Sequence, residues 1–529
     1  MLILQNLTYT HPDKDVLFTD IDLAINRQDK IALVGNNGSG KSTLLKIMTG
    51  MLQPASGIIK ADSRPYYVPQ LTGQYNGLTI AQALGVADKL QALQQILAGN
   101  VSEANMNTLN DDWTIEERCA EAMLHWQLQG FNLDTKMATL SGGEKTKVLL
   151  AGIDIHQPEI VLLDEPSNHL DSAARKLLYE YVAATNNTLV VVSHDRALLN
   201  LLPATYELSK LGITIYGGNY DFYAEQKAIE SSALNSDVRS KEKALRKAKE
   251  TEREAMKRKQ KQDARGRKKQ DKAGVPTIML NTLRNNAEKS SSRIKDMHAE
   301  KIGDIAQELN ELRKELPDAD RMKIGFEDSG LHTGKILVTA RDINFSYNSA
   351  TLWQQSLNFI IISGQRIAVK GLNGSGKTTL IKLILGQLQP IEGTLERAIT
   401  NAVYIDQDYS LIDNGLTVYD QALQYNTDNL QEHEVKSKLT HFLFTKAYWD
   451  KPCNTLSGGE KMRLMLCCLT IAGQAPDIII LDEPTNNLDM QNVDILTNAI
   501  EDYKGTIIAI SHDAYFLQQI GIQEKIELK

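Results

Sequence analysis

The sequence predicts an α/β protein with two P-loop nucleotide-binding domains, joined by a long antiparallel helical hairpin. Three segments of the first half return in the same order in the second half: 33–59 at 369–395, 140–152 at 456–468, and 160–171 at 478–489. Within each copy, apolar β-branched runs alternate with helical stretches, which is typical of a mostly parallel sheet. The insert between the copies has scarcely a Gly or Pro in its first half and is rich in charged helix formers. The chain is therefore a tandem duplication with an insertion.

The repeat predicts three domains, at 1–222, 223–330 and 331–529. Copy one runs 71 residues from Gln70 to Ser141, whereas copy two runs 50 from Gln407 to Ser457. The extra residues predict a short arm-like insertion near 88–112.

The insert is predicted to begin with one long charged helix from about 224 to 272. Gly274 and Pro276 are expected to end this helix. From about 278 to 316, apolar residues recur at three-four spacing, as expected for a helix that packs back on the first. At 1.5 Å per residue, such a hairpin would extend roughly 60 Å.

Composition indicates an ordinary globular protein, with 42% hydrophobic and 23% charged residues. No apolar run reaches the 18 residues of a membrane span, and the first residues lack the basic start of an export signal. The four cysteines show no CxxC spacing and are expected to be reduced core thiols. These observations argue against membrane-spanning and secreted proteins and favour a cytoplasmic one.

The charge is concentrated in the insert. Residues 239–272 hold 16 Lys/Arg against 6 Asp/Glu, a local +10 in a chain of net charge −8, so the remainder carries −18. A basic segment on an acidic body suggests a polyanionic partner, although a solvated helix surface explains a charge run by itself.

Both copies carry G-x-x-x-x-G-K-[ST] between an apolar strand and a helix. Backbone N–H groups of such a loop wrap phosphates, the Lys neutralises them, and the Ser or Thr hydroxyl reaches Mg²⁺. The expected ATP-binding residues of copy one are Gly35, Asn36, Asn37, Gly38, Ser39, Gly40, Lys41, Ser42 and Thr43. Those of copy two are Gly371, Leu372, Asn373, Gly374, Ser375, Gly376, Lys377, Thr378 and Thr379.

Further polar residues follow the apolar strands at matching positions. Asp164 and Asp482 are expected to hold Mg²⁺, and the adjacent Glu165 and Glu483 to orient or deprotonate water, although such carboxylates also cap helices. His194 and His512 each follow the Glu by 29 residues, which favours γ-phosphate sensors over structural histidines. Gln70 and Gln407 are expected to join the Mg²⁺ and water network.

A third motif, LSGGE, offers a second anion-binding helix start in each copy. Its residues are Ser141, Gly142, Gly143 and Glu144 in copy one, and Ser457, Gly458, Gly459 and Glu460 in copy two. With the P-loop, Gln, DE and His motifs in this order, the chain resembles ABC ATPases. That resemblance implies that the LSGGE of each copy completes the ATP site of the other, so that two ATP molecules join the copies within one monomer.

Two such domains and a charged linker resemble the ABC-F translation factors. The resemblance implies a cytoplasmic ATPase that uses ATP and Mg²⁺ and binds the 70S ribosome near the tRNA exit site, without a membrane or a transmembrane subunit. Its linker would contact rRNA and P-site tRNA. Basic residues near the expected tip are the candidate RNA contacts: Arg265, Arg267, Lys268, Lys269 and Arg284.

One departure from the family pattern concerns adenine. Tyr347 lies 24 residues before Gly371 and fits the aromatic residue that stacks on the base, whereas His11 stands at the same distance before Gly35. Two other functions remain open: the ATPase subunit of a transporter, and a DNA-repair or chromosome-associated ATPase. The motifs leave open general translation, relief of stalling and protection from antibiotics.

Overall fold

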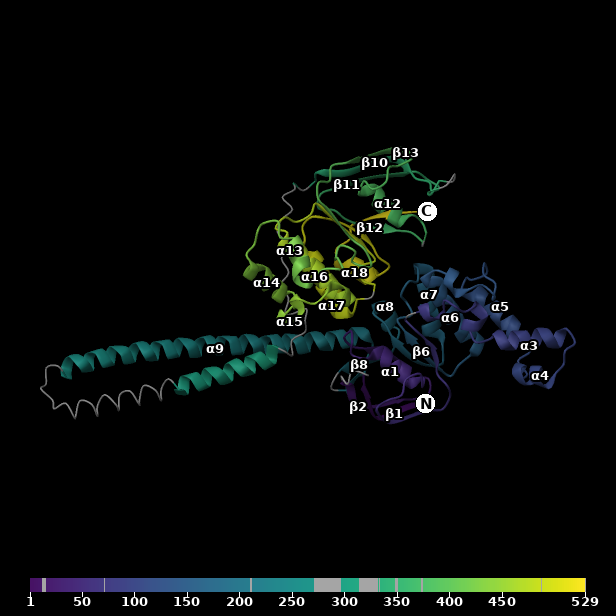
Figure 1. Cartoon of the computed structure of the whole chain (residues 1–529), viewed down its shortest axis with the longest axis horizontal. Helices are drawn as coiled ribbons and strands as arrows, with labels where there is room; N and C mark the ends of the chain where they lie inside the picture. The colour runs from purple at the N-terminus through teal and green to yellow at the C-terminus, as the bar shows by residue number, and fades with distance from the viewer. Residues whose placement is uncertain are drawn as a thin grey trace. The chain divides into compact units, whose positions relative to one another are not determined.

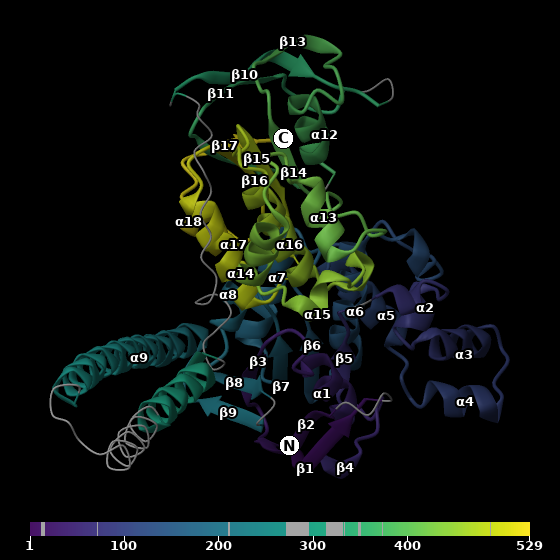
Figure 2. The same cartoon turned by 60° about the vertical axis from the view of Figure 1, so that its left-hand side comes forward.

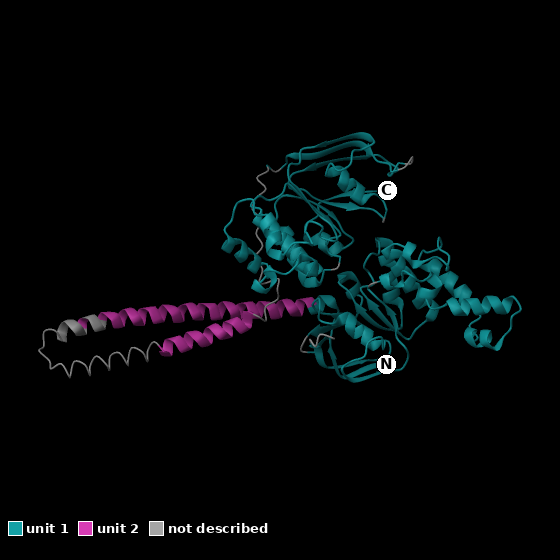
Figure 3. Ribbon diagram, viewed as in Figure 1, with its two compact units in different colours: residues 1–223, 322–529 teal, residues 224–321 magenta. Residues whose placement is uncertain are grey.

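The computed structural model describes residues 1–11, 16–70, 72–209, 212–270, 296–313, 332, 334–347, 351–372, 374–486 and 488–528 (Figures 1 and 2). The chain forms two compact units: Met1–Tyr223 with Met322–Lys529, and Ala224–Arg321 (Figure 3). The first unit holds both copies of the repeat. Among the helices described, none is long and apolar enough to cross a membrane.

Copy one contains two sheets. The antiparallel sheet has the order β2-β1-β4, from β1 (Leu2–Thr10), β2 (Val16–Ile25) and β4 (Ser56–Ala61). The larger sheet has the order β5-β6-β7-β3-β8-β9, and its strands are β3 (Lys30–Val34), β5 (Tyr66–Val68), β6 (Ile160–Asp164), β7 (Thr188–Val192), β8 (Ala204–Ser209) and β9 (Gly212–Tyr216). All its pairings except β8–β9 are parallel, so the carboxyl ends of β3, β6 and β7 meet at one edge.

The helices of copy one are α1 (Lys41–Met48), α2 (Ile80–Ala83), α3 (Ala87–Leu97), α4 (Glu103–Leu109), α5 (Ile115–His125), α6 (Gly142–His156), α7 (Ser172–Ala184) and α8 (Arg196–Leu199). Two 3₁₀ turns lie at Gly73–Tyr75 and Met137–Thr139. The insertion expected near 88–112 contains α3 and α4, which lie side by side and are tied by a hydrogen bond from Asn105 to Gln95 (Figure 2).

Copy two repeats this plan. Its antiparallel sheet has the order β11-β10-β13, from β10 (Ile336–Asn344), β11 (Leu357–Ile362) and β13 (Glu392–Arg397). Its parallel sheet has the order β14-β15-β16-β12-β17, from β12 (Arg366–Lys370), β14 (Ala402–Ile405), β15 (Ile478–Asp482), β16 (Thr506–Ile510) and β17 (Glu524–Glu527). Its helices are α12 (Lys377–Ile384), α13 (Val418–Gln424), α14 (Glu432–His441), α15 (Lys446–Trp449), α16 (Gly458–Ile471), α17 (Met490–Asp502) and α18 (Ala514–Gln519), with a 3₁₀ turn at Cys453–Thr455.

Each copy has its own apolar core between its two sheets and its P-loop helix. In copy one, strands β1 to β3 and helix α1 contribute buried Leu and Ile side chains, and copy two matches this with β10, β12 and α12. The four cysteines are free and buried, as the sequence predicts for core thiols.

The two copies also contact each other within the first unit. Arg196, at the start of α8, pairs with Asp494 of α17 at 2.5 Å, and its guanidinium lies 4.1 Å from the ring centroid of Tyr515. The same guanidinium lies 5.9 Å from the ring of Tyr220, the first residue of α9.

The second unit contains most of α9 (Tyr220–Gln270), a helix of 51 residues that would measure about 75 Å at 1.5 Å per residue. Residues 296–313 form a helix that runs back along α9 (Figure 3). Val238 and Leu309 are buried between the two helices, and ion pairs join Lys241 to Glu308 and Arg313 to Glu242. The expected break at Gly274 and Pro276 lies outside the described residues.

Candidate functional site

The P-loops place glycines where the backbone is left-handed. Gly38 and Gly40 have φ of 78° and 99°, and Gly374 and Gly376 have 81° and 90°. The caps of α1 and α12 are Gly40 and Gly376, and neither has a side-chain cap, so the first N–H groups of both helices remain for an anion. Asn373 lies outside the described residues.

Each P-loop also leaves a buried hydroxyl without a partner. Ser39 Oγ and Ser375 Oγ, at the same position of the two loops, have no hydrogen-bond partner among the described residues. An unpaired buried polar group is costly, and a phosphate bound at each loop would satisfy the hydroxyl of that loop.

The P-loop lysines fold back over their own loops. Lys41 Nζ donates to the carbonyls of Gly35 at 2.6 Å and Asn36 at 3.2 Å, and Lys377 Nζ donates to Gly371 at 2.8 Å. Burial lowers the pKa of Lys41, and the carboxylates of Glu165, Asp489 and Asp164 counteract this. Both ammonium groups lie where phosphate charge would arrive.

The carboxylates at the ends of β6 and β15 each accept a tyrosine hydroxyl. Asp164 accepts from Ser42 at 3.0 Å and from Tyr67 at 2.9 Å, and Asp482 accepts from Tyr404 at 2.7 Å. Burial raises the pKa of both carboxyls. Neither tyrosine is among the candidate residues predicted from the sequence, although each precedes the Gln of its copy by three residues.

Glu165 and Glu483 occupy the same strained backbone conformation, with φ of 51° and 48°. Non-glycine residues rarely adopt this region, and such strain gathers at functional sites. The amide of each Glu donates to the end of the neighbouring strand, at Val192 and Ile510 respectively, both at 2.8 Å. The two copies therefore aim these carboxyl groups in the same way.

A histidine lies beside each of these glutamates. His194 Nε2 is 3.2 Å from Glu165 Oε1, and His512 Nε2 is 3.5 Å from Glu483 Oε1. Burial raises the pKa of Glu165 and lowers that of His194. Burial likewise raises the pKa of Glu483 to about 7 and lowers that of His512 to about 4. A carboxyl with a pKa near neutral is suited to accept a proton from water.

The first cavity has a volume of about 310 Å³, and all its described lining residues come from copy one. They include Lys41, Ser42, Gln70, Asp164 and Glu165, together with His11 and His194. The structure thus brings the candidate phosphate, metal and water-binding groups of copy one together.

The second cavity has a volume of about 610 Å³ and combines the two copies. Copy two contributes Lys377, Thr378, Gln407, Asp482, Glu483 and His512, along with Tyr347 and Thr379. Copy one contributes Ser141, Gly142, Gly143, His169, Leu170 and Arg175. The LSGGE segment of copy one therefore faces the P-loop of copy two.

Both LSGGE motifs begin a helix through the same capping arrangement. Glu144 accepts from the Ser141 amide and hydroxyl, both at 2.7 Å, while Glu460 accepts from the Ser457 amide at 2.8 Å. The glutamate thus fixes the orientation of the serine at the start of α6 or α16. Neither Glu144 nor Glu460 is among the described residues that line the two cavities.

At the first P-loop, the contact from copy two is a hydrogen bond to an aspartate. Asp489 Oδ2 accepts the backbone amide of Asn37 in the first P-loop at 3.0 Å. Ser457, Gly458 and Gly459 are not among the described residues that line this cavity. Among the described residues, the first cavity is therefore lined by copy one alone, whereas the second is lined by both copies.

The two candidate adenine positions are equivalent in space. His11 lines the first cavity and Tyr347 the second, and each packs edge-on against the aromatic residue two positions before it. The Tyr347 ring is 64% exposed, and its hydroxyl lies 3.0 Å from Thr379 Oγ1. A ring at this place is free to meet a base in the second cavity, and an imidazole occupies it in the first.

The candidate RNA contacts are described only in part. Arg265, Arg267, Lys268 and Lys269 belong to the last two turns of α9, and Arg265 is exposed. Arg284 lies outside the described residues.

A Mg²⁺ ion fits the residues at each P-loop. Ser42 Oγ and Asp164 Oδ1 already converge at 3.0 Å, and Gln70 lines the same cavity. Mg²⁺ prefers one or two protein oxygen ligands together with substrate phosphates. Thr378, Asp482 and Gln407 line the second cavity in the same roles.

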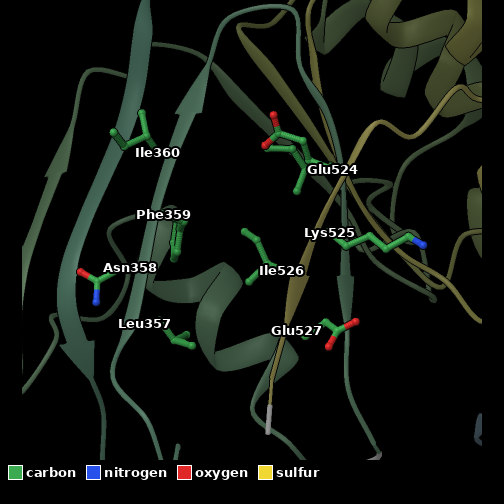
Figure 4. A pocket seen from close by; sticks show the side chains of 9 residues that line it. Leu357, Asn358, Phe359, Ile360, Glu524, Lys525, Ile526 and Glu527 are labelled. Atoms are coloured by element: carbon green, nitrogen blue, oxygen red, sulfur yellow. The ribbon is translucent and has the colours of Figure 1, made fainter.

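Another cavity, of about 300 Å³, lies between β11 and β17 of copy two. Phe359 and Ile526 extend from the two strands toward the space between them (Figure 4). This cavity shares no described residue with either P-loop cavity, and we assign it no function.

The comparisons with known proteins agree with this geometry. The family described as "ABC transporter" matches residues 18–168 and 354–486, one segment in each copy and more than half of the chain together. The chain belongs to the ABC family. It is similar to ABC transporter F family member 5 of Arabidopsis thaliana, with 29% identity over 98% of this chain and 73% of that protein. Within the ABC family it is thus a member of the F family.

Two further likenesses concern proteins whose names mention the ribosome. This ABC-F protein is 28% identical to the ribosome protection protein VmlR of Bacillus subtilis (strain 168), over 98% of this chain and 85% of that protein. Its fold is similar to the crystal structure of the archaeal ribosome recycling factor aABCE1 in complex with the stalk protein aP1 (TM-score 0.60, 20% identity, 97% of this chain and 86% of that chain).

Proposed function

We propose that this ABC-F protein is an ATP-hydrolysing translation factor that binds the ribosome near the tRNA exit site. Its linker contacts rRNA and P-site tRNA, ATP closes the two copies, and hydrolysis releases them. The similarity to VmlR supports the ribosome as partner. The role in general translation, stalling relief or antibiotic protection stays open.

The observation that carries the proposal is the second cavity. Ser141, Gly142 and Gly143 of copy one and the P-loop of copy two line one space of about 610 Å³. An ATP molecule bound there would touch both copies, so its binding free energy would favour the closed arrangement. Its hydrolysis would remove the terminal phosphate that both copies contact.

The chemistry assigned to the chain is phosphoryl transfer to water. Lys41 and Lys377 neutralise the terminal phosphates, and Glu165 and Glu483 orient water and accept its proton. His194 and His512 stand beside the glutamates as neutral side chains, because burial holds their pKa low. Mg²⁺, when bound by Ser42, Asp164 and Gln70 or by their counterparts, would neutralise phosphate charge.

The linker supplies the expected RNA contact. A long exposed helix with cations near its end presents charge to phosphates without reading base sequence, and such binding weakens as salt increases. Arg265, Arg267, Lys268 and Lys269 are the residues of this proposed contact that belong to α9.

Ribosome co-sedimentation tests this function. The variant with both Glu165→Gln and Glu483→Gln should bind ATP without hydrolysing it and should therefore stay closed. It should travel with 70S particles in ATP, and should lose them when Arg265, Arg267, Lys268 and Lys269 become Ala. The matched control replaces Lys243, Lys247, Arg253 and Lys257, which lie on the same helix away from its end.

Either of two results would contradict the proposal. The trapped variant could remain at the top of the gradient although it binds ATP, or it could bind duplex DNA more strongly than ribosomes. The second result would favour the DNA-associated function. A membrane-bound fraction in cells would favour the transporter subunit.

A further inference from the structure

We propose that Arg175 of copy one is a phosphate-binding residue of the second ATP site, supplied across the contact between the copies. The proposal rests on the proposed ATP binding at that site. It adds a cation that belongs to none of the motifs in the sequence and that makes the two ATP sites chemically different.

The fold holds Arg175 at the wall of the second cavity. It lies in the first turn of α7, whose start is capped by Asp171 through the amide of Ala174. Arg175 Nε donates to the Leu170 carbonyl at 3.2 Å, and Nη1 lies 3.9 Å from Asp195. These contacts fix the guanidinium plane, and the side chain is only 12% exposed.

The terminal nitrogens of this guanidinium are available to an anion. Among the described residues, neither Nη1 nor Nη2 has a hydrogen-bond acceptor, because the distance to Asp195 exceeds that of a hydrogen bond. Asp195 itself accepts a hydrogen bond of 2.5 Å from Tyr179. A buried guanidinium with unused donors is an expected phosphate ligand, since its fork matches phosphate oxygens.

The surroundings place Arg175 at the hydrolytic end of the site. It lines the cavity together with Lys377, Glu483 and His512 of copy two, and with Gly143 of its own copy. After burial, its charge is the largest influence on the pKa of both Glu483 and His512, which shows that it lies near them. The terminal phosphate of ATP, which these residues surround, is therefore the group that Arg175 would contact.

Among the described residues that line the first cavity, none is a cation supplied by copy two. The position equivalent to Arg175 in copy two is Val493, four residues after Asp489, and it is buried in α17. Copy two instead offers the first P-loop the Asp489 carboxylate, which accepts the Asn37 amide. Asp171 of copy one likewise acts on Lys377 and His512 at the second site, so the guanidinium of Arg175, and not the carboxylate, is what distinguishes the two sites.

The test measures nucleotide binding at the second site alone. In the full chain with Lys41→Met and Glu483→Gln, only the second P-loop keeps its lysine, and hydrolysis is blocked. Adding Arg175→Met should weaken ATP binding about tenfold or more, as for loss of a charge-assisted hydrogen bond. ADP binding should change less than about threefold, because ADP lacks the terminal phosphate that Arg175 would contact.

Two variants control for packing and for net charge. Lys176→Met removes the next cation on α7, which is exposed beside Glu180, and should change ATP affinity less than about twofold. Arg175→Lys keeps a charge without the fork and should lose ATP affinity by an intermediate factor. If Arg175→Met does not fold, Arg175→Lys still provides the comparison of ATP with ADP.

Unchanged ATP affinity, or an equal loss for ATP and ADP, would overturn the inference. So would an equal effect of Arg175→Met on ATP binding in the mirror background, Lys377→Met with Glu165→Gln. If the parent variant binds no ATP, the proposed function itself fails. If it binds ATP alike with and without Arg175, only this inference fails.

Discussion

At the scale of single residues, the two copies place the same residue types in the same geometry at their candidate sites. Glu165 and Glu483 share a left-handed backbone, and Asp164 and Asp482 each accept a tyrosine hydroxyl. A tyrosine that orients a metal-binding carboxylate changes metal affinity without touching the metal.

The tyrosine contact leads to a testable prediction. The double variant Tyr67→Phe, Tyr404→Phe should raise the Mg²⁺ concentration for half-maximal ATPase activity by about tenfold, because both carboxylates lose an orienting donor. The control is Tyr66→Phe, which removes a hydroxyl that donates to the Leu149 carbonyl instead. An identical Mg²⁺ response of the two variants would show that the tyrosines serve packing alone.

Residues outside a recognised motif were the ones that sequence reasoning missed. Tyr67 and Tyr404 lie within apolar strand segments, where a tyrosine is expected simply because it favours strands. Arg175 lies on a helix, where a cationic side chain is ordinarily expected to be exposed to solvent. Only the fold shows that the two tyrosine hydroxyls reach the carboxylates at the strand ends and that Arg175 lines the second cavity. The P-loop glycines, in contrast, were predictable from the sequence, because a loop that wraps a phosphate requires glycine at fixed positions.

At the scale of elements, the sheet of copy two depends on a buried carboxylate. Asp477, just before β15, accepts from the Thr400 hydroxyl at 2.6 Å and from the amides of Thr400 and Asn401 at 2.9 and 3.0 Å. This links the start of β14 to β15. Burial raises the pKa of Asp477, but these hydrogen bonds outweigh burial and hold it below the usual value.

The lowered pKa of Asp477 determines how the stability of the protein depends on pH. A carboxyl whose folded-state pKa is lowered adds stability above its unfolded pKa, about 3.9, and that stability is lost as pH falls through the folded value. Asp477→Asn should therefore lower the Tm at neutral pH, by the equivalent of about 1–2 kcal/mol. The difference from the native protein should shrink below about pH 4.

Thermal melts at several pH values check this prediction. Asp408→Asn, at an exposed position of the same copy, is the matched control and should change stability by less than about 0.5 kcal/mol. A Tm difference for Asp477→Asn that stays constant from pH 7 to pH 3 would contradict the assigned role of the charge.

The elements themselves were largely predictable. The apolar runs at Ile160–Asp164 and Ile478–Asp482 form central strands, and the LSGGE motifs begin α6 and α16. The charged insert forms α9, because its helix formers run almost without Gly or Pro. The side-by-side pair α3 and α4 required the structure, since a length difference between copies shows where residues are added but not their fold.

At the scale of the whole molecule, the proposed ATP-driven closure depends on which copy completes each ATP site. The family resemblance implies two shared sites, each completed by the LSGGE segment of the other copy. The structure brings Gly143 of copy one to the cavity of Lys377, while Ser457 and Gly459 are not among the described residues that line the cavity of Lys41. Sequence alone cannot distinguish these cases, because both LSGGE motifs are intact.

Orthovanadate photocleavage tests the shared second site most directly. Vanadate takes the place of the terminal phosphate and, under ultraviolet light, cuts the backbone beside it. In the Lys41→Met variant with Mg²⁺ and ATP, mass spectrometry should find cuts in two places: at Lys377–Thr378 of copy two and at Ser141–Gly143 of copy one. Cuts at Lys377–Thr378 together with Ser457–Gly459, and none at Ser141–Gly143, would contradict the account.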